Sequence, residues 1–317
     1  MSYEKLADLL RCEIEGILSN LKESAGLLSL AREPLEKKQR GLYSNINHNY
    51  PWALLPAIVA ETICGNGEIS LPAAASFQFL FAAGDVFDDI EDADSPDSIY
   101  KKYGLPVAVS VATTLLILGE QSLTRLKLRG VNADTIVHVA NSINSFYTSA
   151  CIGQHLDLTT ELLLSASEEV YLKIITMKSA IQIEGACYIG ALLAGANGEV
   201  IDKFASFGHN LGIASQISND IQGSIIGKDI IKHKTTLPVI YCLNSSDETI
   251  RNKMKSLYQK QSFSTLDTKE VKDILFRSGA IHYSTLKMEL YKQKVQDILS
   301  EIQKIGINVE NLKVFCR

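Results

Sequence analysis

The chain has 317 residues, of which 46% are hydrophobic and 21% are charged, and its net charge at pH 7 is −5. This composition supplies ample material for a large core, and the absence of a long basic run argues against nucleic acid as a partner. The six cysteines are scattered and form no Cys-x-x-Cys pair. They are therefore expected to be reduced, buried residues of a cytoplasmic protein rather than zinc ligands or disulfides.

Neither a signal peptide nor a membrane span is expected. The N-terminal segment MSYEKLADLLRCEIEGIL is amphipathic and mixed in charge, and it lacks the basic-then-apolar layout of a signal peptide. The most apolar run, residues 105–119, is about fifteen residues long, whereas a membrane-spanning helix needs about twenty. We therefore expect a buried core helix there and no stable membrane insertion.

Apolar residues recur at intervals of three and four along most of the chain, which is the pattern of helices with one buried face. The expected helical segments, in chain order, are residues 6–28, 52–63, 73–87, 107–128, 135–158, 168–193, 200–221, 236–243, 269–276 and 281–305. Glycines stand between several of these segments, as expected of helix C-caps. Because no convincing two-residue alternation occurs, the sequence predicts an all-α fold, with residues 1–317 forming one large helical bundle.

One acidic segment ends the helix expected over residues 73–87. The sequence FAAGDVFDDIEDADSPD, residues 81–97, holds seven acidic residues and no basic one. On a helix, Asp85, Asp88, Asp89 and Asp92 fall at i, i+3, i+4 and i+7, so they share one face. A hard cation such as Mg²⁺ would convert their repulsion into binding. On spacing alone, a solvated acidic helix end is an equally good interpretation.

A second polar cluster lies far downstream, beside an expected buried helix. It includes Gln216, Asn219, Asp220, Ser224 and Lys234. Between the two clusters, Gln154 and Lys178 stand in otherwise apolar helices, where polar side chains need partners. A diphosphate bound in a central cavity would supply those partners.

With these motifs the chain resembles the trans-isoprenyl diphosphate synthase, or polyprenyl synthetase, family over residues 30–245. Six elements match in the family's order: Asp88-Asp89-Ile90-Glu91-Asp92 as DDxxD, residues 103–108 as yG-x-x-x-A, Gly153-Gln154 with Asp157 as GQ-x-x-D, Lys178-Ser179-Ala180 as Lys-Thr-Ala, residues 216–220 as Q-x-x-D-D, and residues 234–238 as K-x-T-L-P. The resemblance implies an isoprenoid synthase bundle with a central cavity, with residues 246–317 as C-terminal helices. A homodimer is expected.

The resemblance also assigns a role to each residue of the expected site. Asp88, Asp89, Lys178 and Asp220 would be the catalytic residues, and an allylic isoprenyl diphosphate would be the substrate. The Mg²⁺ ligands, for three ions with substrate bound, would be Asp85, Asp88, Asp89 and Asp92 on one side and Asp220, Asn219 and Ser224 on the other. The groups that neutralise and orient the leaving diphosphate would be Lys178, Lys234, Gln154 and Gln216. The small residues Ala83 and Gly84 would leave room for a prenyl tail of C15 or longer, with Phe81 beside it.

Three departures from the family pattern bear on function, and two of them concern the second substrate. The second aspartate-rich motif is reduced to Asn219-Asp220-Ile221-Gln222-Gly223. Ser95-Pro96-Asp97-Ser98 stands where the family has an arginine pair, and NINHNYP, residues 45–51, replaces an upstream basic element. In the family those basic residues hold isopentenyl diphosphate, and Asn, His or Ser cannot replace the charge and fork of arginine.

The sequence therefore predicts Mg²⁺-dependent ionisation of an allylic diphosphate and transfer of the prenyl group to an acceptor. This pattern is similar to ComQ-type prenyltransferases, which modify a peptide pheromone. The main alternative is a terpene synthase, in which the substrate's own double bond is the nucleophile. A regulatory subunit of a prenyl diphosphate synthase is a lesser alternative, and ordinary chain elongation is a further one.

Overall fold

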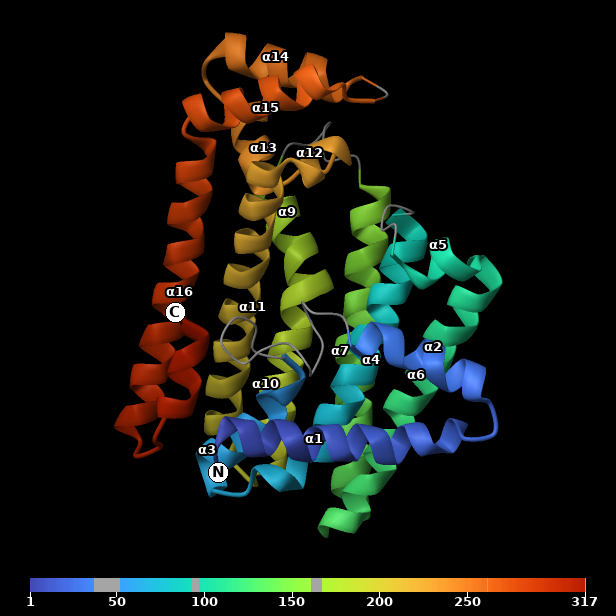
Figure 1. Ribbon diagram of the computed structural model, residues 1–317. Coiled ribbons are helices and arrows are strands. Elements are labelled where there is room, and N and C mark those ends of the chain that lie inside the picture. Colours follow the sequence, from blue (N-terminus) through green and yellow to red (C-terminus); the bar gives the residue numbers. More distant parts are fainter. Residues whose placement is uncertain (37–51, 93–96, 161–166, 261, 317) are drawn as a thin grey trace.

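The computed structural model describes residues 1–36, 52–92, 97–160, 167–260 and 262–316, and in these ranges every regular element is a helix (Figure 1). The α-helices are α1 (Tyr3–Leu18), α2 (Ala25–Leu35), α3 (Leu55–Cys64), α4 (Leu71–Asp92), α5 (Ile99–Tyr103), α6 (Leu105–Thr124), α7 (Ala133–Thr159), α9 (Glu168–Ile175), α10 (Ile181–Leu193), α11 (Gly198–Ile226), α12 (Lys228–Ile231), α13 (Leu237–Leu243), α14 (Glu248–Tyr258), α15 (Thr265–Arg277) and α16 (Ala280–Lys304). Short 3₁₀ turns are η1 (Ser19–Leu21), η2 (Trp52–Leu54), η3 (Gly67–Ser70), η4 (Arg125–Arg129) and η6 (Glu310–Cys316), and η5 (Thr176–Ala180) is a π-helix. The predicted all-α class is confirmed.

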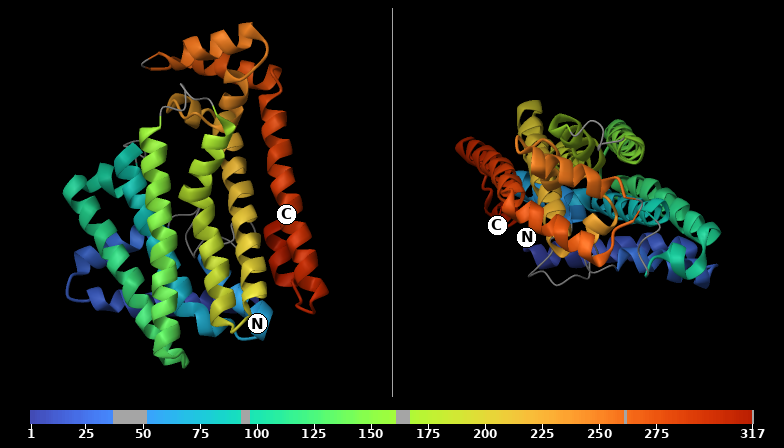
Figure 2. Two further views of the ribbon diagram at one scale, coloured as in Figure 1. Left: turned by 180° about the vertical axis from the view of Figure 1, so that it is seen from behind. Right: turned by 90° about the horizontal axis from the view of Figure 1, so that it is seen from above.

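The long helices run side by side along one axis of the molecule (Figures 1 and 2). In that bundle α4 packs against α6, and α11 packs between α10 and α16. Helix α1 crosses the bundle near one end, while α14 and α15 lie across the other end. The C-terminal ends of α4, α7 and α11 all point toward the end that carries α12–α15. Asp88, Gln154 and Asp220 stand toward those ends.

The main core forms where the apolar faces of α1, α3, α4, α6 and α10 meet. In α4, Phe77 and Phe79 are fully buried on different faces of the helix, which explains why its first four turns are apolar nearly all round. A smaller apolar cluster joins α13, α14 and α15, where Met254, Leu257 and Val271 are buried. Burial of the α4 stem fixes the position from which its acidic end projects.

Two expectations about individual helices were wrong. The segment predicted over residues 6–28 is two helices, because the Ser24 hydroxyl accepts a hydrogen bond from the Leu27 amide and caps a new helix, α2. Helix α14 was not predicted, because it is mostly polar and buries only Met254, Leu257 and Tyr258. An Asp247 cap, accepting from the Thr249 amide at 2.8 Å, marks its start.

The length argument against a membrane span was also wrong. Among the described residues, the helical runs Gly67–Glu91 and Leu105–Arg129 are both long and apolar enough to cross a membrane by length and composition. In their most apolar stretches 78% and 44% of the residues are buried, respectively. A buried helix at the centre of a large bundle has the same composition, so length alone does not separate the two cases.

Candidate active site

The acidic end of α4 carries one face of the site. Asp88 lies four residues after Gly84 and seven after Phe81, so the three share a helix face. The Asp88 side chain is 43% exposed, Asp85 and Asp89 are half-buried, and Gly84 has open space beside it, since a Cβ there would meet nothing within 4 Å. A ligand can therefore reach this face.

Ala83 lies elsewhere. It is fully buried, and its position on α4 is roughly opposite that of Asp88, so it packs into the core. The predicted pair of small residues is thus divided between two faces, and only Gly84 stands on the one that carries Asp88. The Asp92 side chain lies outside the described part of the chain.

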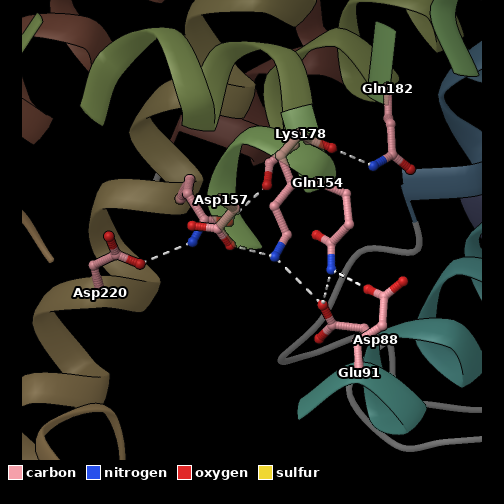
Figure 3. A network of polar contacts seen from close by, with 9 residues as sticks. Asp88, Glu91, Gln154, Asp157, Lys178, Gln182 and Asp220 are labelled. Carbon is pink, nitrogen blue, oxygen red and sulfur yellow. Dashed lines mark hydrogen bonds and ion pairs between the residues drawn. The ribbon is translucent and has the colours of Figure 1, made fainter. Parts of the chain in front are cut away.

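Helix α7 meets the end of α4 through an amide side chain. The Gln154 Nε2 group donates to Asp88 Oδ1 at 3.2 Å and to Glu91 Oε2 at 2.5 Å (Figure 3). Gln154 therefore ties α7 to two carboxylates of the first motif and restricts how they turn.

Lys178 stands at the centre of the network. Its Nζ donates to Asp157 Oδ2 at 2.7 Å and to Asp88 Oδ1 at 3.3 Å, so it bridges α7 and α4 (Figure 3). Burial favours the neutral amine, but the carboxylates of Asp157 and Asp88 outweigh burial and raise the pKa of Lys178 above its ordinary value. The site therefore holds a fixed cation beside the first aspartate-rich motif.

The backbone around Lys178 is unusual. Lys178 lies in the π-helix η5, a rare conformation that often occurs at functional sites. Helix α7 approaches this turn so closely that a Cβ on Gly153 would lie 2.3 Å from the backbone nitrogen of Lys178. Only glycine fits there, and this close contact brings Gln154 and Asp157 of α7 within reach of Lys178 and Asp88.

Asp220 of α11 forms the opposite wall. It is 9% exposed, and its two carboxylate oxygens accept hydrogen bonds from the Tyr171 hydroxyl at 2.7 Å and from Gln216 Nε2 at 2.8 Å. Gln216 in turn accepts from Ser179, next to Lys178, at 3.0 Å. The two walls are therefore joined by a chain of polar contacts, and Figure 3 shows Asp220 across from Asp88.

Burial raises the pKa of Asp220 to about 6, helped by the charge of Asp229 and opposed by the two hydrogen bonds and the charge of Lys234. Lys234 also opposes the raised pKa of Lys178. The positive charge of Lys234 therefore opposes both shifts, that of Asp220 on one wall and that of Lys178 on the other.

A pH dependence of stability follows from Asp220. Its pKa is raised in the folded state, so protonation stabilises the fold and that stability is lost as pH rises from about 4 through about 6. The full shift is worth about 3 kcal/mol. In EDTA, the Asp220→Asn variant should therefore gain stability relative to the parent as pH increases over this range, as measured by urea unfolding. A constant difference between the two proteins from pH 4 to pH 7 would contradict this expectation.

Two predicted metal ligands near Asp220 receive less support. The Ser224 hydroxyl is 1% exposed and is hydrogen-bonded to Thr236 at 3.1 Å, so it already has a partner in the core. Asn219 is exposed, a quarter-turn around the helix from Asp220.

The site residues predicted from sequence omit three members of this network, which are Glu91, Asp157 and Tyr171. Asp157 could have been found, because it belongs to the GQ-x-x-D element. Tyr171 stands on α9, seven residues before Lys178, but its partner Asp220 is far along the chain.

The donor chemistry fits Mg²⁺ held jointly with phosphate. Within the described residues, no group of three or more His, Cys, Asp or Glu side chains could hold a metal ion by itself. Mg²⁺ commonly uses one or two carboxylates, completing its shell with water and substrate phosphates. Asp88 and Asp89 on α4 and Asp220 on α11 are such carboxylates, and Asp88 is ion-paired with Lys178 at 3.3 Å.

Comparison with known proteins gives the family of this site. The polyprenyl synthetase family model matches residues 57–275. The chain belongs to the polyprenyl synthetase family. It is 29% identical over 273 residues to a geranylgeranyl diphosphate synthase of Sulfolobus acidocaldarius, with 82% of each chain covered. It is 27% identical over 279 residues to the tryptophan prenyltransferase ComQ of Bacillus subtilis, covering 85% of this chain and 87% of ComQ.

Among solved structures, the geranylgeranyl pyrophosphate synthetase of Pyrococcus horikoshii has the same fold, with a TM-score of 0.82 at 21% identity over 100% of this chain and 97% of that chain. The predicted family and fold are confirmed. Because its curated relatives are prenyltransferases and isoprenyl diphosphate synthases, this member of the family is an isoprenyl diphosphate synthase-like prenyltransferase. The terpene synthase alternative gains no support from these relatives.

Proposed function

We propose that the protein ionises an allylic isoprenyl diphosphate with Mg²⁺ and transfers the prenyl group to an electron-rich acceptor other than isopentenyl diphosphate. The observation that carries the proposal is the position of Lys178, which bridges Asp88 and Asp157 opposite Asp220. A cation flanked by carboxylates on facing helices suits a leaving diphosphate and its metal ions, because developing negative charge is best stabilised by groups already in place.

The reaction begins when the bond between the allylic carbon and the diphosphate oxygen breaks and its electron pair leaves with the diphosphate. Lys178 and Lys234 neutralise part of that charge directly, and Gln154 holds the Asp88 and Glu91 carboxylates in one orientation. Mg²⁺ held by Asp88, Asp89 and Asp220 would act as a Lewis acid on the diphosphate oxygens. The allylic carbon then forms a bond to the acceptor, which loses a proton.

The acceptor is proposed from what the chain lacks. Residues 45–51, 95 and 96, where basic elements are missing, lie outside the described residues. Ser98, in the same stretch, is fully buried and accepts a hydrogen bond from the Lys101 amide at 3.2 Å as the N-cap of α5. Position 98 therefore caps helix α5 and supplies no positive charge. Since one relative is a tryptophan prenyltransferase, the indole of a peptide tryptophan is the acceptor we favour.

The assay that tests this function supplies Mg²⁺ with geranyl, farnesyl or geranylgeranyl diphosphate. Each is given alone, with isopentenyl diphosphate, and with a tryptophan-containing peptide. Pyrophosphate release measures ionisation, and mass spectrometry of the products identifies the acceptor.

The open space beside Gly84 supports a tail of C15 or longer. Gly84→Phe should place a ring on the face shared with Phe81 and Asp88 and exclude long tails, while geranyl diphosphate is still used. We expect the ratio of kcat/KM for farnesyl over geranyl diphosphate to fall at least tenfold, since filling a pocket forfeits about 1–3 kcal/mol. Gly84→Ala is the matched control and should leave the ratio unchanged. An unaltered chain-length preference in Gly84→Phe would mean that the tail lies elsewhere.

A homodimer, a cytoplasmic location and the absence of membrane insertion are further proposals. Helix α6 leaves Val109, Leu116 and Ile117 exposed, and a second copy of the chain would cover this apolar face. In the most apolar stretch of residues 105–129, 44% of the residues are buried. Such a helix is consistent with burial of its remaining apolar surface against a partner subunit rather than in lipid.

A further inference from the structure

The second aspartate-rich motif has glycine at its last position, and that glycine makes an uncommonly close contact. A Cβ on Gly223 would lie 1.7 Å from Oδ2 of Asp229 and 2.4 Å from its Cγ. No residue but glycine can therefore occupy position 223 while Asp229 keeps its place. The three atoms nearest to that Cβ all belong to the Asp229 carboxylate.

The Asp229 carboxylate consequently occupies the space of a side chain at position 223. Residue 223 follows Asp220 by three positions, so side chains at the two positions are neighbours on α11. Asp229 reaches this place from α12, which folds back on α11 after Gly227, a residue with φ of 100° (Figure 1). Its backbone is held there because the Asp229 carbonyl accepts from the Lys234 amide at 2.9 Å.

Asp229 is well placed to act with Asp220. It is 7% exposed, and its charge contributes to the raised pKa of Asp220. Two carboxylates near each other in a buried site repel one another, and a bound cation relieves that repulsion. Asp220 alone would give the α11 wall a single carboxylate, whereas Mg²⁺ can take two.

We propose that Asp229 supplies, with Asp220, the carboxylates for Mg²⁺ on the α11 wall, in place of the acidic side chain that position 223 lacks. This inference rests on the proposed function. The carboxylates of the second metal site would then come from two helices, α11 and α12, although the sequence motif itself keeps only one of three aspartates.

The close contact allows the carboxylate to be moved from one helix to the other. Asp229→Ala removes it, and Gly223→Ala should displace it, because the new Cβ takes its space. The double variant Gly223→Asp/Asp229→Ala restores a carboxylate from α11, since the atoms that would clash with it are gone. Gly223→Ala/Asp229→Ala is its matched control, with the same relief of contact and no carboxylate. Asp229→Asn keeps the shape and removes the charge.

Binding of inorganic pyrophosphate is measured by titration calorimetry over a range of Mg²⁺ concentrations, with thermal melts in EDTA to check each fold. We expect the Mg²⁺ concentration for half-maximal binding to rise at least tenfold in Asp229→Ala, Asp229→Asn, Gly223→Ala and the matched control. The relocated carboxylate should recover most of that loss. Asp202→Asn, an exposed position on the same helix, should bind like the parent.

Parent-like Mg²⁺ dependence in Asp229→Asn and Asp229→Ala would overturn the inference while leaving the proposed function intact. So would a loss that the relocated carboxylate does not repair in a folded protein, because Asp229 would then act only on local structure. If the parent itself shows no Mg²⁺-dependent pyrophosphate binding, the proposed function fails, and the inference fails with it.

Discussion

Asp88→Ala should lower the rate of diphosphate release by about a hundredfold to a thousandfold, the range found when one preorganised charge-stabilising group is removed. The structure explains why the effect should be large. Asp88 Oδ1 accepts from both Lys178 and Gln154, so its loss would remove a proposed metal ligand and also release the two side chains that it holds. The measurement is pyrophosphate release under single-turnover conditions at saturating Mg²⁺.

The same substitution should leave the fold almost unchanged. Asp88 is 43% exposed and Lys178 keeps its shorter contact to Asp157, so the free energy of unfolding should change by about 1 kcal/mol or less. Removal of one carboxylate also reduces repulsion within the acidic end of α4. Asp134→Ala, at an exposed site in the first turn of α7, is the control and should keep full activity. Activity of Asp88→Ala within tenfold of the parent would show that Asp88 is no Mg²⁺ ligand.

The first wall of the site could be predicted from sequence because it is local. Asp85, Asp88 and Asp89 belong to one continuous helix, so their spacing alone fixes their shared face. The apolar stem before them likewise predicted burial, and Phe77 and Phe79 are fully buried.

The second wall depends on contacts that no spacing reveals. Tyr171 and Asp220 are 49 residues apart in sequence, and their hydrogen bond exists only because α9 packs beside α11. The π-helix at Lys178 inserts a residue into the helical repeat, which shifts faces in a way that a 3.6-residue period cannot anticipate. Ser224 is a reasonable metal ligand by spacing because it lies one turn from Asp220. In the fold, however, its hydroxyl is hydrogen-bonded to Thr236, which lies beyond α12.

The second aspartate-rich motif also looks incomplete in the sequence because a residue distant in the chain lies beside it in the fold. Read along the chain, Gly223 is a lost ligand position. In space it is a gap that Asp229 fills after a turn of the backbone, and glycine is the residue that permits it. Departures from a motif can therefore mark a rearranged site, and only the fold distinguishes this from a lost one.

Isopentenyl diphosphate should be a poor acceptor for this protein. Charge-assisted hydrogen bonds contribute about 1.5–3 kcal/mol each, so the absence of two should weaken binding by about a hundredfold to ten-thousandfold. The remaining basic residues near the first motif are poorly placed to compensate. Lys102 is paired with Glu33 at 3.1 Å, Lys101 lies over the Tyr100 ring at 5.4 Å, and Arg40 lies outside the described residues.

Ionisation should survive this loss, because Asp88, Lys178 and Asp220, which we propose bind the allylic diphosphate and its Mg²⁺, are separate from the missing basic residues. We therefore expect farnesyl or geranylgeranyl diphosphate alone to release pyrophosphate slowly, giving the prenyl alcohol as water captures the cation. Addition of a tryptophan-containing peptide should accelerate release and give a prenylated peptide, while micromolar isopentenyl diphosphate should leave both rate and products unchanged. Efficient elongation at that concentration would contradict the proposed acceptor and return the protein to ordinary chain synthesis, with bases other than the family's arginines holding the second diphosphate.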